Sequence, residues 1–398
     1  MYLTSNVKSE CCGCGACLNV CPKKAISMNE DDMGFLYPTI EMEECVNCHL
    51  CEKVCPVVSP PLMSKAVDTP TLIAVTQKDV EILMKSASGG VFTQIVQWFL
   101  SKGDGFIYGA AMNRDLKVKH ICSWNHEKID EIRGSKYVIS DTDNCFHKIK
   151  DQLSEGYRVL FSGTPCQVAA LRNVVGENDK LVCVDLVCHG APSQKLFNDY
   201  VRYEENNLKK KIIKIQFHHK IYKRKKWTIR NILITTKDGK NYPMTRFQSD
   251  YLRAYHQNLM NRDSCYECVF SKPERYGDIT IGDFWGIEKF YQQLIVERGV
   301  SICSVNTKVG MEISEYLEAT MDYYTIDRDK YVTLFRNSLA QSGGIKMNPQ
   351  RHQFLNIEKN QGFRRAVSKI LPFHKDQYLY YLVETKRKIK RVLRKHSK

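Results

Sequence analysis

Between residues 70 and 300, short apolar runs alternate with longer stretches in which apolar residues recur at helical spacing. Four short runs predict strands, at residues 72–75, 106–110, 158–161 and 181–187. Residues 91–100 form a mostly apolar stretch that predicts a buried helix, residues 143–153 predict a second helix, and a third starts near Cys166. Such alternation is typical of α/β architecture with an at least partly parallel sheet.

The pattern changes elsewhere in the chain. Residues 231–236 and Tyr242 flank Asp238-Gly239, a two-residue turn signal that predicts a local antiparallel hairpin. From about residue 310 onward the pattern is mainly helical. The segment VVSPP at 57–61 marks an earlier boundary, because paired prolines favour an extended linker. We therefore expect three regions: a module at 1–62, a mixed α/β domain at 70–305, and a mostly helical region at 306–398.

Two matched cysteine runs lie in the first region. Each follows the spacing C-x2-C-x2-C-x3-C-P without insertion, and the runs consist of Cys11, Cys14, Cys17 and Cys21, and of Cys45, Cys48, Cys51 and Cys55. This spacing is the signature of a bacterial-type ferredoxin with two [4Fe–4S] clusters, in which the fourth cysteine of each run binds the other cluster. Zinc or disulfides are the alternatives, but the four-plus-four spacing and both prolines favour clusters.

The ligand assignment follows from this crossed pattern. One cluster takes Cys11, Cys14, Cys17 and Cys55, and the other takes Cys45, Cys48, Cys51 and Cys21. Cys12 breaks the spacing and is interpreted as a non-ligand. Gly13 and Gly15 supply the backbone freedom that so tight a loop needs. The sequence therefore predicts a ferredoxin-like module that transfers electrons.

The composition is that of a globular protein whose cysteines serve metal. The chain has 398 residues, of which 43% are hydrophobic and 17 are cysteine. So many cysteines would suit a disulfide scaffold only in a short secreted protein. The N-terminal sequence MYLTSNVKSECC has no apolar signal-peptide core, and no apolar stretch reaches the length of a membrane span. We expect a reduced, cytoplasmic protein without a transmembrane segment.

The charge is strongly basic, with a formal net charge of +15. The surplus is concentrated at residues 209–230 and in the tail at 386–398, where Ile389, Val392 and Leu393 fit a short basic amphipathic helix. Such patches attract nucleic acid, anionic membrane surfaces, acidic proteins or phosphorylated substrates, and an ordinary solvated surface accounts for them equally well. Nucleic acid is disfavoured because no nucleic-acid-binding fold signature is present.

Further candidates lie beside turns. Ser86-Ala87-Ser88-Gly89-Gly90 precedes the apolar helix at Val91, so a serine N-cap and free backbone N–H groups could hold a phosphate there. Four cysteines beside Gly, Pro or each other could form a four-thiolate site or be small buried residues: Cys166, Cys188, Cys265 and Cys268. The remaining Cys122, Cys145, Cys183 and Cys303 have nondescript surroundings and are expected to be inert. His189 and the pair His218-His219 are candidate general acids, although a lone histidine is more often structural.

Five sequence blocks carry a family resemblance. In chain order they are SASGGVF at 86–92, RGSKY at 133–137, GTPCQ at 163–167, CHGAPS at 188–193 and GDITIGDFWG at 277–286. Over residues of about 70–290 the chain resembles the beta subunit of coenzyme F-420-reducing hydrogenase and its relatives, which include plant 7-hydroxymethyl chlorophyll a reductase. The fused N-terminal ferredoxin strengthens the resemblance, which says little about residues after about 300.

The resemblance implies a flavoprotein that binds FAD and holds a third [4Fe–4S] cluster in the flavin domain. Carried over by motif, the flavin-contact positions are Ser88, Gly89, Gly90, Lys136 and Tyr137. The cluster-ligand positions are Cys166, Cys188, Cys265 and Cys268. No catalytic residue is assigned, and neither the substrate nor use of the deazaflavin coenzyme carries over.

We therefore expect an FAD- and [4Fe–4S]-dependent oxidoreductase. It would pass electrons between an acidic carrier such as ferredoxin, its clusters, FAD and an organic small molecule that could be phosphorylated, in either direction. Bacterial relatives with this fused architecture are often associated with surface-polysaccharide gene sets, which is one expected setting. The alternative is an electron-transfer subunit of a larger redox complex with no substrate site of its own.

Overall fold

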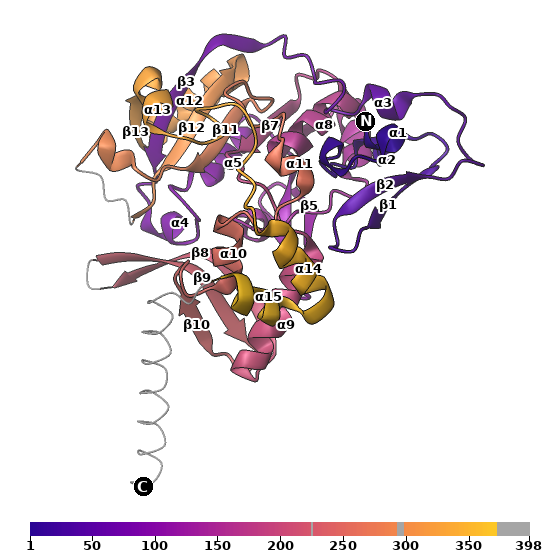
Figure 1. Ribbon diagram of the computed structural model, residues 1–398. Coiled ribbons are helices and arrows are strands. Elements are labelled where there is room, and N and C mark those ends of the chain that lie inside the picture. The colour runs from indigo at the N-terminus through magenta and orange to yellow at the C-terminus, as the bar shows by residue number, and fades with distance from the viewer. Residues whose placement is uncertain (224–225, 293–297, 372–398) are drawn as a thin grey trace.

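The computed structural model describes residues 1–223, 226–292 and 298–371 (Figure 1). The expected tail helix around Ile389 therefore lies outside the described residues. Among the described helices, none is both long enough and apolar enough to span a bilayer.

The N-terminal module is small and built around its cysteine loops. It consists of α1 (Tyr2–Ser5), the 3-10 turn η1 (Lys8–Glu10), α2 (Ala16–Val20), the antiparallel pair β1 (Ile26–Glu30) and β2 (Leu36–Ile40), and α3 (Leu50–Lys53). Gly13 and Gly15 both adopt positive φ, 68° and 77°, as the tight first loop requires. The module packs against the side of the larger domain, as Figure 1 shows near the N-terminus.

The centre of the molecule is an eight-stranded mixed sheet in the order β13-β3-β12-β11-β7-β6-β4-β5. Its strands are β3 (Ala66–Thr76), β4 (Gly105–Met112), β5 (Val118–Trp124), β6 (Arg158–Gly163), β7 (Leu181–Leu186), β11 (Ile279–Asp283), β12 (Ser301–Thr307) and β13 (Asp322–Ile326). The pairs β4–β6, β6–β7 and β7–β11 are parallel and the other pairs are antiparallel. The predicted partly parallel sheet is confirmed.

Helices cover both faces of this sheet. Along β6, Val159 and Phe161 pack with α7 (Cys145–Ser154) and α8 (Pro165–Val175), whereas Leu160 packs on the opposite face with α5 (Val91–Ser101) and α12 (Lys308–Thr320). This alternation follows from the two-residue period of a strand. Shorter elements near the sheet are α4 (Val80–Met84), α6 (Ile129–Ile132), α11 (Asp263–Tyr266), η2 (Ile287–Lys289) and α13 (Arg328–Leu334).

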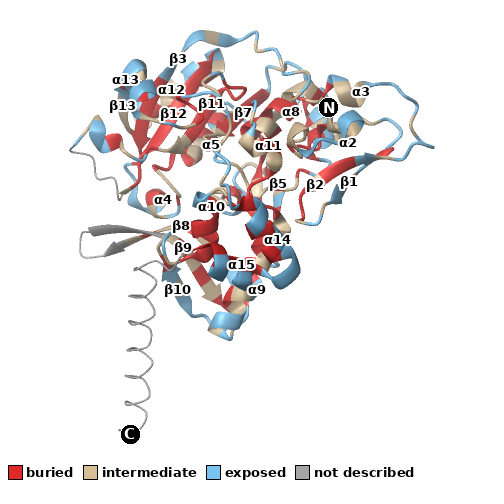
Figure 2. Cartoon of the chain, viewed as in Figure 1, coloured by how far each residue is buried: buried red, intermediate tan, exposed pale blue. Residues whose placement is uncertain are grey.

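A second layer with its own core lies below the sheet in Figure 2. It contains the three-stranded sheet β8 (Ile212–Lys223), β9 (Lys226–Thr236) and β10 (Asn241–Met244), with helices α9 (Gln194–Leu208), α10 (Asp250–His256), α14 (Arg351–Gln361) and α15 (Phe363–Ile370). Phe197 and Tyr251 are fully buried there, with their ring centroids 5.3 Å apart. The layer draws on the middle and the end of the chain.

Three sequence predictions need correction. The boundary at 305/306 falls inside the sheet, because β12 continues to Thr307 and β13 pairs with β3, so the mostly helical region after 306 also contributes to the sheet. The β9–β10 hairpin exists, but Thr236 and Lys240 close a three-residue loop with Gly239 at φ 75°, rather than a two-residue turn. The N-cap of α5 is Gly90, not a serine.

Candidate functional site

The first four predicted ligands meet at one cavity, which we call the inner site. Cys11, Cys14, Cys17 and Cys55 all line it. Burial raises the pKa of the Cys17 thiol to about 12, because a thiolate is poorly solvated there. The structure thus brings together the crossed set that the spacing predicted, three cysteines from one run and the last of the other.

The second set, the outer site, lies nearer the solvent. Cys45, Cys48 and Cys51 lie on one loop that runs into α3, and Cys21 is the C-cap of α2, which packs against α3. Cys48 is exposed, and the neighbouring Met42 and Val46 are 66% and 55% exposed. The two halves of the repeated motif therefore end in different environments.

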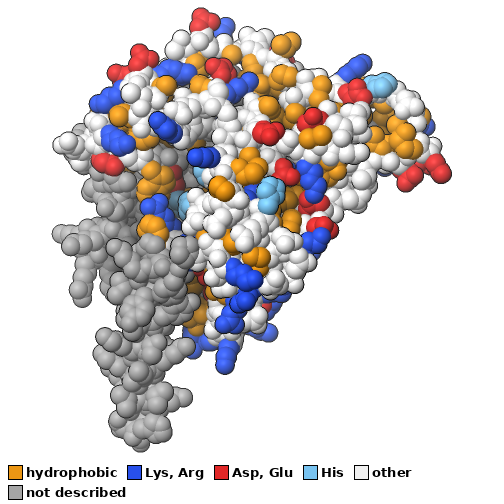
Figure 3. Space-filling model, viewed as in Figure 1, with side chains coloured by type: hydrophobic (Ala, Val, Ile, Leu, Met, Phe, Trp, Pro, Cys, Tyr) orange, Lys and Arg blue, Asp and Glu red, His pale blue; other side chains and the backbone are white. Residues whose placement is uncertain are grey.

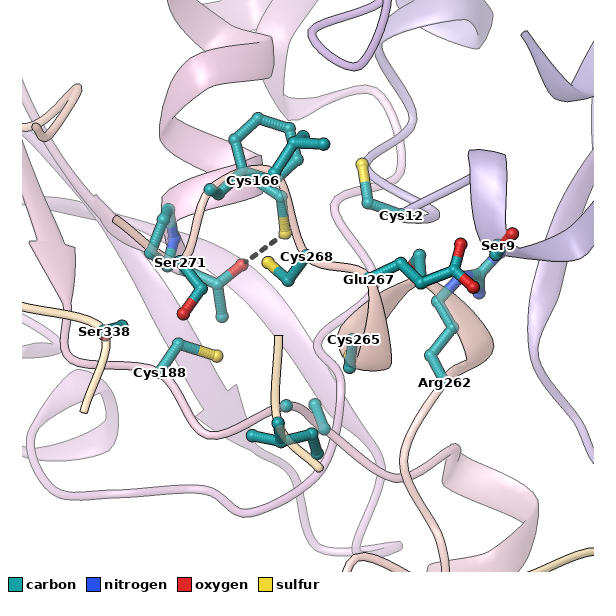
Figure 4. Close-up of a pocket in the computed structure, with 18 of the residues that line it drawn as sticks. Ser9, Cys12, Cys166, Cys188, Arg262, Cys265, Glu267, Cys268, Ser271 and Ser338 are labelled. Atoms are coloured by element: carbon teal, nitrogen blue, oxygen red, sulfur yellow. Dashed lines mark hydrogen bonds between the residues drawn. The ribbon is translucent and has the colours of Figure 1, made fainter. Parts of the chain in front are cut away.

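The third set comes together only through the fold of the larger domain. Cys166 opens α8, Cys188 follows β7, and Cys265 and Cys268 lie in and after α11. All four line one cavity of about 70 Å³, which we call the third site (Figure 4). Thr164 caps α8 together with Gln167, and its hydroxyl lies 3.1 Å from Cys166 Sγ. Burial raises the pKa of Cys265 to about 12.

The cysteines of the inner site and of the third site line two cavities. In the described residues no three His, Cys, Asp or Glu side chains stand close enough to share one metal ion. A cubane needs a different arrangement, since each thiolate binds its own iron and the sulfurs surround a cavity. Among the described residues, which include every cysteine of the chain, all 17 cysteines are free thiols.

Cys12 joins the inner and third sites. It is 9% exposed and lines both cavities. Its thiol interacts with the thiols of Cys14 and Cys166, one from each site. Figure 4 shows Cys12 beside the third-site cysteines. The residue that breaks the ferredoxin spacing is therefore the contact between two predicted cluster sites.

The module is fixed to the domain by buried polar contacts around these sites. Thr142 Oγ1 donates to the carbonyl of Cys14 (3.0 Å), and the Asn173 amide donates to the carbonyls of Val54 (3.2 Å) and Ser59 (2.6 Å). Because each bond reaches a segment next to a cluster ligand, docking sets the distance between the inner and third sites.

The expected flavin segment is held against the sheet. Ser88 Oγ donates to the Val300 carbonyl (2.9 Å), and the Gly89 N–H donates to Ser301 Oγ (3.0 Å). A Cβ at Gly89 would lie 2.4 Å from the Val75 carbonyl oxygen, and Gly90 has a φ of 84°. Both glycines are thus required by packing and backbone conformation, which the sequence reasoning attributed to a ligand alone.

The expected contacts Lys136 and Tyr137 have different surroundings. Lys136 Nζ donates to the carbonyls of Glu131, Ile132 and Arg133 at the end of α6, and burial lowers its pKa to about 7. Tyr137 OH lies 2.7 Å from His218 Nε2. Lys136 therefore closes a helix end, while Tyr137 belongs to a polar network.

That network connects Tyr137 to Ser88. His218 Nδ1 lies 3.1 Å from Asp283 Oδ2, as an ion pair rather than an aligned hydrogen bond. Although burial raises the pKa of Asp283, the charge of His218 and the side chain of Ser88 hold that pKa below its usual value. The Tyr137 ring also lies 5.0 Å from the ring of Tyr255, which is next to Cys188. Two of the expected flavin contacts are thereby joined to each other and to the third site.

A polar cavity of about 280 Å³ lies between α4, α5 and α6. It is lined by Thr93 of α5, by Lys85 after α4 and by Arg133 of the RGSKY block. Thr93 Oγ1, Gln94 Oε1 and Gln77 Nε2 are buried near the start of α5 without a hydrogen-bond partner. Buried polar groups are normally paired, so this region fits a polar ligand.

Comparison with known proteins identifies two parts of the chain. Residues 156–329 match the family model for the C terminus of the beta subunit of coenzyme F420 hydrogenase/dehydrogenase, and residues 10–58 match a 4Fe-4S dicluster domain. The family resemblance is confirmed. Over residues 156–329 the chain resembles this beta subunit, and it also carries an N-terminal 4Fe-4S dicluster domain.

A curated relative is the F subunit of the F(420)H(2) dehydrogenase of Methanosarcina mazei, 24% identical over 244 residues. The match covers 58% of this chain and 65% of that relative, just under two thirds of its length. A chain of the F420-reducing [NiFe] hydrogenase complex from Methanosarcina barkeri superposes with a TM-score of 0.45 at 20% identity, over 77% of this chain and 92% of that one.

The other residues predicted for this beta-subunit-like chain are accounted for as follows. Cys145, Cys183 and Cys303 are buried in the core and Cys122 is half-buried, as expected of inert thiols. The candidate acid His189 lies 2.9 Å from Asn258 Oδ1, and burial lowers the pKa of His189.

In the basic segment, Lys211 pairs with Glu205 (3.1 Å) and Lys210 with Asp238, while the side chains of residues 222–230 lie outside the described ones.

Sequence reasoning missed two residues of this site. Asp283 stands inside the family block GDITIGDFWG, so the block itself could have identified it. Arg262 lies three residues before Cys265 and is 4% exposed against the inner-site loop. No sequence signal distinguishes it from other arginines, because its contacts are with segments more than 200 positions away.

Proposed function

We propose that this protein relays electrons from the outer cluster through the inner cluster to a third cluster, and from there to FAD. One observation carries the proposal: Cys12 lies between the inner site and the third site and lines both cavities. Two cluster sites joined through one thiol form a continuous path for electrons. The 4Fe-4S dicluster match at residues 10–58 supports the first two clusters, and the beta-subunit match supports the redox role of the larger domain.

The third cluster is the first proposed addition. Its four cysteines surround a cavity in the core of the domain, where a thiolate without metal is unfavourable because burial raises the pKa of Cys265 and of Cys268. Cluster binding removes that cost, because the iron takes the place of the thiol protons. The residues present therefore fit a [4Fe–4S] cluster.

FAD is the second proposed addition. The unpaired polar atoms of Gln77, Thr93 and Gln94 and the cavity lined by Arg133 fit its polar groups. Ser88 and Tyr137 lie at either end of the His218–Asp283 pair, so they would hold the ligand, and Tyr255 lies between Tyr137 and Cys188. When bound, a flavin converts between one-electron and two-electron transfer. His218 is then placed to exchange a proton through Tyr137 OH.

The test of the third cluster is iron analysis of the anaerobically reconstituted full chain. We expect about twelve irons per chain in the wild type and about eight in C268S, since one cubane of four irons is lost. C303A is the matched control, because Cys303 is fully buried in β12, away from the three sites. About eight irons in the wild type, unchanged in C268S, would show that the third site holds no cluster.

The test of FAD is identification of the flavin released from the same preparation. We expect FAD, and we expect R133Q to lose it while keeping its iron, because Arg133 lines the polar cavity. K102Q, at the other end of α5 on an exposed residue paired with Glu312, should keep its flavin. A preparation with full iron and no flavin would overturn the flavin half of the proposal and leave the cluster relay in place.

The substrate-free alternative has support of its own. The curated relative is named as a subunit, and Trp285, whose ring lies 6.2 Å from that of His218, is 52% exposed. An exposed aromatic beside the Tyr137–His218 pair suits a partner surface as well as a substrate. Reoxidation of the reduced protein by small organic acceptors supports an enzyme, while reoxidation only by a redox protein supports a subunit.

A further inference from the structure

Arg262 is a buried cation between two of the cysteine sites. It is the N-cap of α11 and precedes Cys265 by three residues, so its backbone belongs to the third-site loop. Its side chain is only 4% exposed and extends into the ferredoxin module. Figure 4 shows Arg262 at the edge of the third-site cavity, near Cys265.

Two hydrogen bonds of the guanidinium go to the backbone of the module. Nε donates to the carbonyl of Cys11 (2.6 Å) and Nη2 to the carbonyl of Leu36 (2.8 Å). The Tyr37 ring centroid lies 4.0 Å from Cζ. A Cβ on Gly13 would lie 2.8 Å from Nη1, so any other residue at this loop position would displace the guanidinium. Arg262 thus reaches from a third-site ligand loop to an inner-site ligand loop.

The charge of Arg262 has no carboxylate partner among the described residues, whereas other buried arginines do. Arg351 pairs with Asp263 (2.5 Å), Arg275 with Asp185 (3.2 Å) and Arg172 with Asp278 (3.0 Å). The neighbouring acid Asp263 is therefore already occupied. A buried charge without a partner is costly, so another negative charge has to offset this one.

The groups that face Arg262 are cysteine thiols, which become thiolates when they bind iron. Burial alone would lower its pKa, but the charges of Cys11, Tyr37, Cys12 and Cys265 raise it. Cys11 is an inner-site ligand and Cys265 a third-site ligand. A [4Fe–4S] cluster with four thiolate ligands is an anion, and each added electron increases its negative charge.

We propose that Arg262 is the shared countercharge of the inner cluster and the third cluster, and that it stabilises the reduced form of both. This inference rests on the third cluster of the proposed function. Low dielectric in the buried interface makes the effect strong, because a nearby charge there is poorly screened. The outer cluster lies at the exposed end of the module and is outside its reach. Arg262 is a positioning residue that acts through the ligands and takes no electron itself.

The experiment compares three variants of the full chain in an EPR-monitored reductive titration, in which dithionite supplies one electron to each cluster. R262Q removes the charge, and R262K keeps the charge but loses the paired donors to Cys11 and Leu36. K8Q is the matched control, because Lys8 also lies over the Tyr37 ring (5.3 Å) but is 46% exposed and paired with Asp31. Solvent screens such a charge.

We expect R262Q to lower the reduction potentials of the inner and third clusters by about 59 mV. For a one-electron couple this is about a tenfold change in the ratio of reduced to oxidised cluster. The outer cluster should stay unchanged, and R262K and K8Q should resemble the wild type. Unchanged potentials in R262Q with full iron content would overturn the inference. Equal shifts in R262Q and R262K would overturn it too, since geometry rather than charge would then be responsible.

If R262Q loses clusters, a second neutral variant shows whether the loss of charge is the cause. This variant is R262M, which keeps an apolar side chain over Tyr37. If R262Q and R262M both lose the inner and third clusters while R262K keeps them, the charge is needed for assembly and the inference stands. If R262K loses them as well, the inference fails. The iron count of the wild type separately reports whether the third cluster exists. If the third cluster is absent from the wild type, the proposed relay is wrong, whatever the variants show.

Discussion

The inner and outer sites of the ferredoxin module have the same cysteine spacing and opposite surroundings. At the inner site, Cys14 is buried and shares a hydrophobic cluster with Phe146 of α7 and Val168 of α8 in the larger domain. At the outer site, Cys48 is exposed on a loop that also exposes Met42. Figure 3 shows apolar and acidic side chains together at this end of the molecule.

The difference shows that spacing and docking have separate effects. Spacing within each run decides which cysteines can hold a cluster, because it brings the sulfurs within reach of one cubane. Docking onto the domain decides how far each cluster is exposed to solvent and which charged groups lie near it. Both factors set the reduction potential of a cluster. A symmetric motif can therefore give one cluster for contact with a partner and one for transfer into the protein.

The largest effect should come from breaking one site at a time. We expect C14S to lose both clusters of the module, about eight irons, because the inner site is part of the interface core that holds the module together. C48S should lose only the outer cluster, about four irons. Anaerobic iron analysis and near-UV circular dichroism measure both. Equal losses in the two variants would mean that docking does not distinguish the sites.

C12A tests the same interface without touching a ligand. Iron content should stay at the wild-type value, while transfer of electrons from the module to the third site slows, since Cys12 occupies the contact between them. Rapid-mixing reduction followed by EPR of the third cluster measures this. C145A, which removes another buried thiol near the module, is the control. Loss of four irons in C12A would make Cys12 a ligand after all.

The two sites should also differ in how fast they are destroyed. Oxidative loss of clusters follows exposure, so ferricyanide with a chelator should remove the outer cluster about tenfold faster than the inner one. The predicted result is a two-step loss of iron, with an EPR signal from the inner cluster remaining after the first step. A single-step loss would indicate that both clusters are equally accessible.

Cluster assembly at the inner site should depend on pH. Burial raises the pKa of Cys17 to about 12 and also raises that of Cys11, so these thiols stay protonated through neutral pH until iron binds. Because the ligand is the thiolate, a rise from pH 7 to pH 9 should speed assembly. Reconstitution of C48S reports the inner site, provided that this variant keeps it.

The smallest effect should come from one docking hydrogen bond. T142V removes the donor to the Cys14 carbonyl, which leaves that buried oxygen without this partner and should cost about 1 kcal/mol. T39V alters an exposed threonine on β2 that bonds Ser27 and Asn29, and should cost less than about 0.5 kcal/mol. Anaerobic thermal unfolding monitored at the cluster absorbance compares them. An equal loss of stability in the two variants would mean that the Thr142–Cys14 hydrogen bond contributes no more than an exposed one.

The sequence was most informative where chemistry is local. The crossed inner set could be read from spacing, because every ligand of the module lies within 45 positions of the others. The elements of the central sheet were also predictable, since short continuous apolar runs such as residues 158–161 are typical of strands that are buried on both faces. Motif resemblance identified the third-site cysteines, which spacing alone could not separate from core thiols.

What could not be predicted depends on contacts between distant segments. The boundary at 305/306 cut through the central sheet because β13 reads as a short half-buried strand whose partner, β3, lies about 250 positions earlier. The serines at 86 and 88 resembled helix caps, yet Ser86 donates to Ile82 and Ser88 to Val300, and the latter bond joins the segment to β12. The role of Arg262 likewise depends on its contacts with the docked module, which the sequence does not show.

The position of β3 has a consequence for how the protein is made. This strand leads the central sheet in sequence, yet its only neighbours in the described structure are β12 and β13, which arise from residues 301–326. On the ribosome it must wait for more than two hundred residues to be synthesised before it can pair, and such non-local pairing is slow. The ferredoxin module, in contrast, has all eight of its cysteines by residue 55. Iron can therefore be loaded at the N-terminus early in translation, whereas the third site has all four of its cysteines only after residue 268.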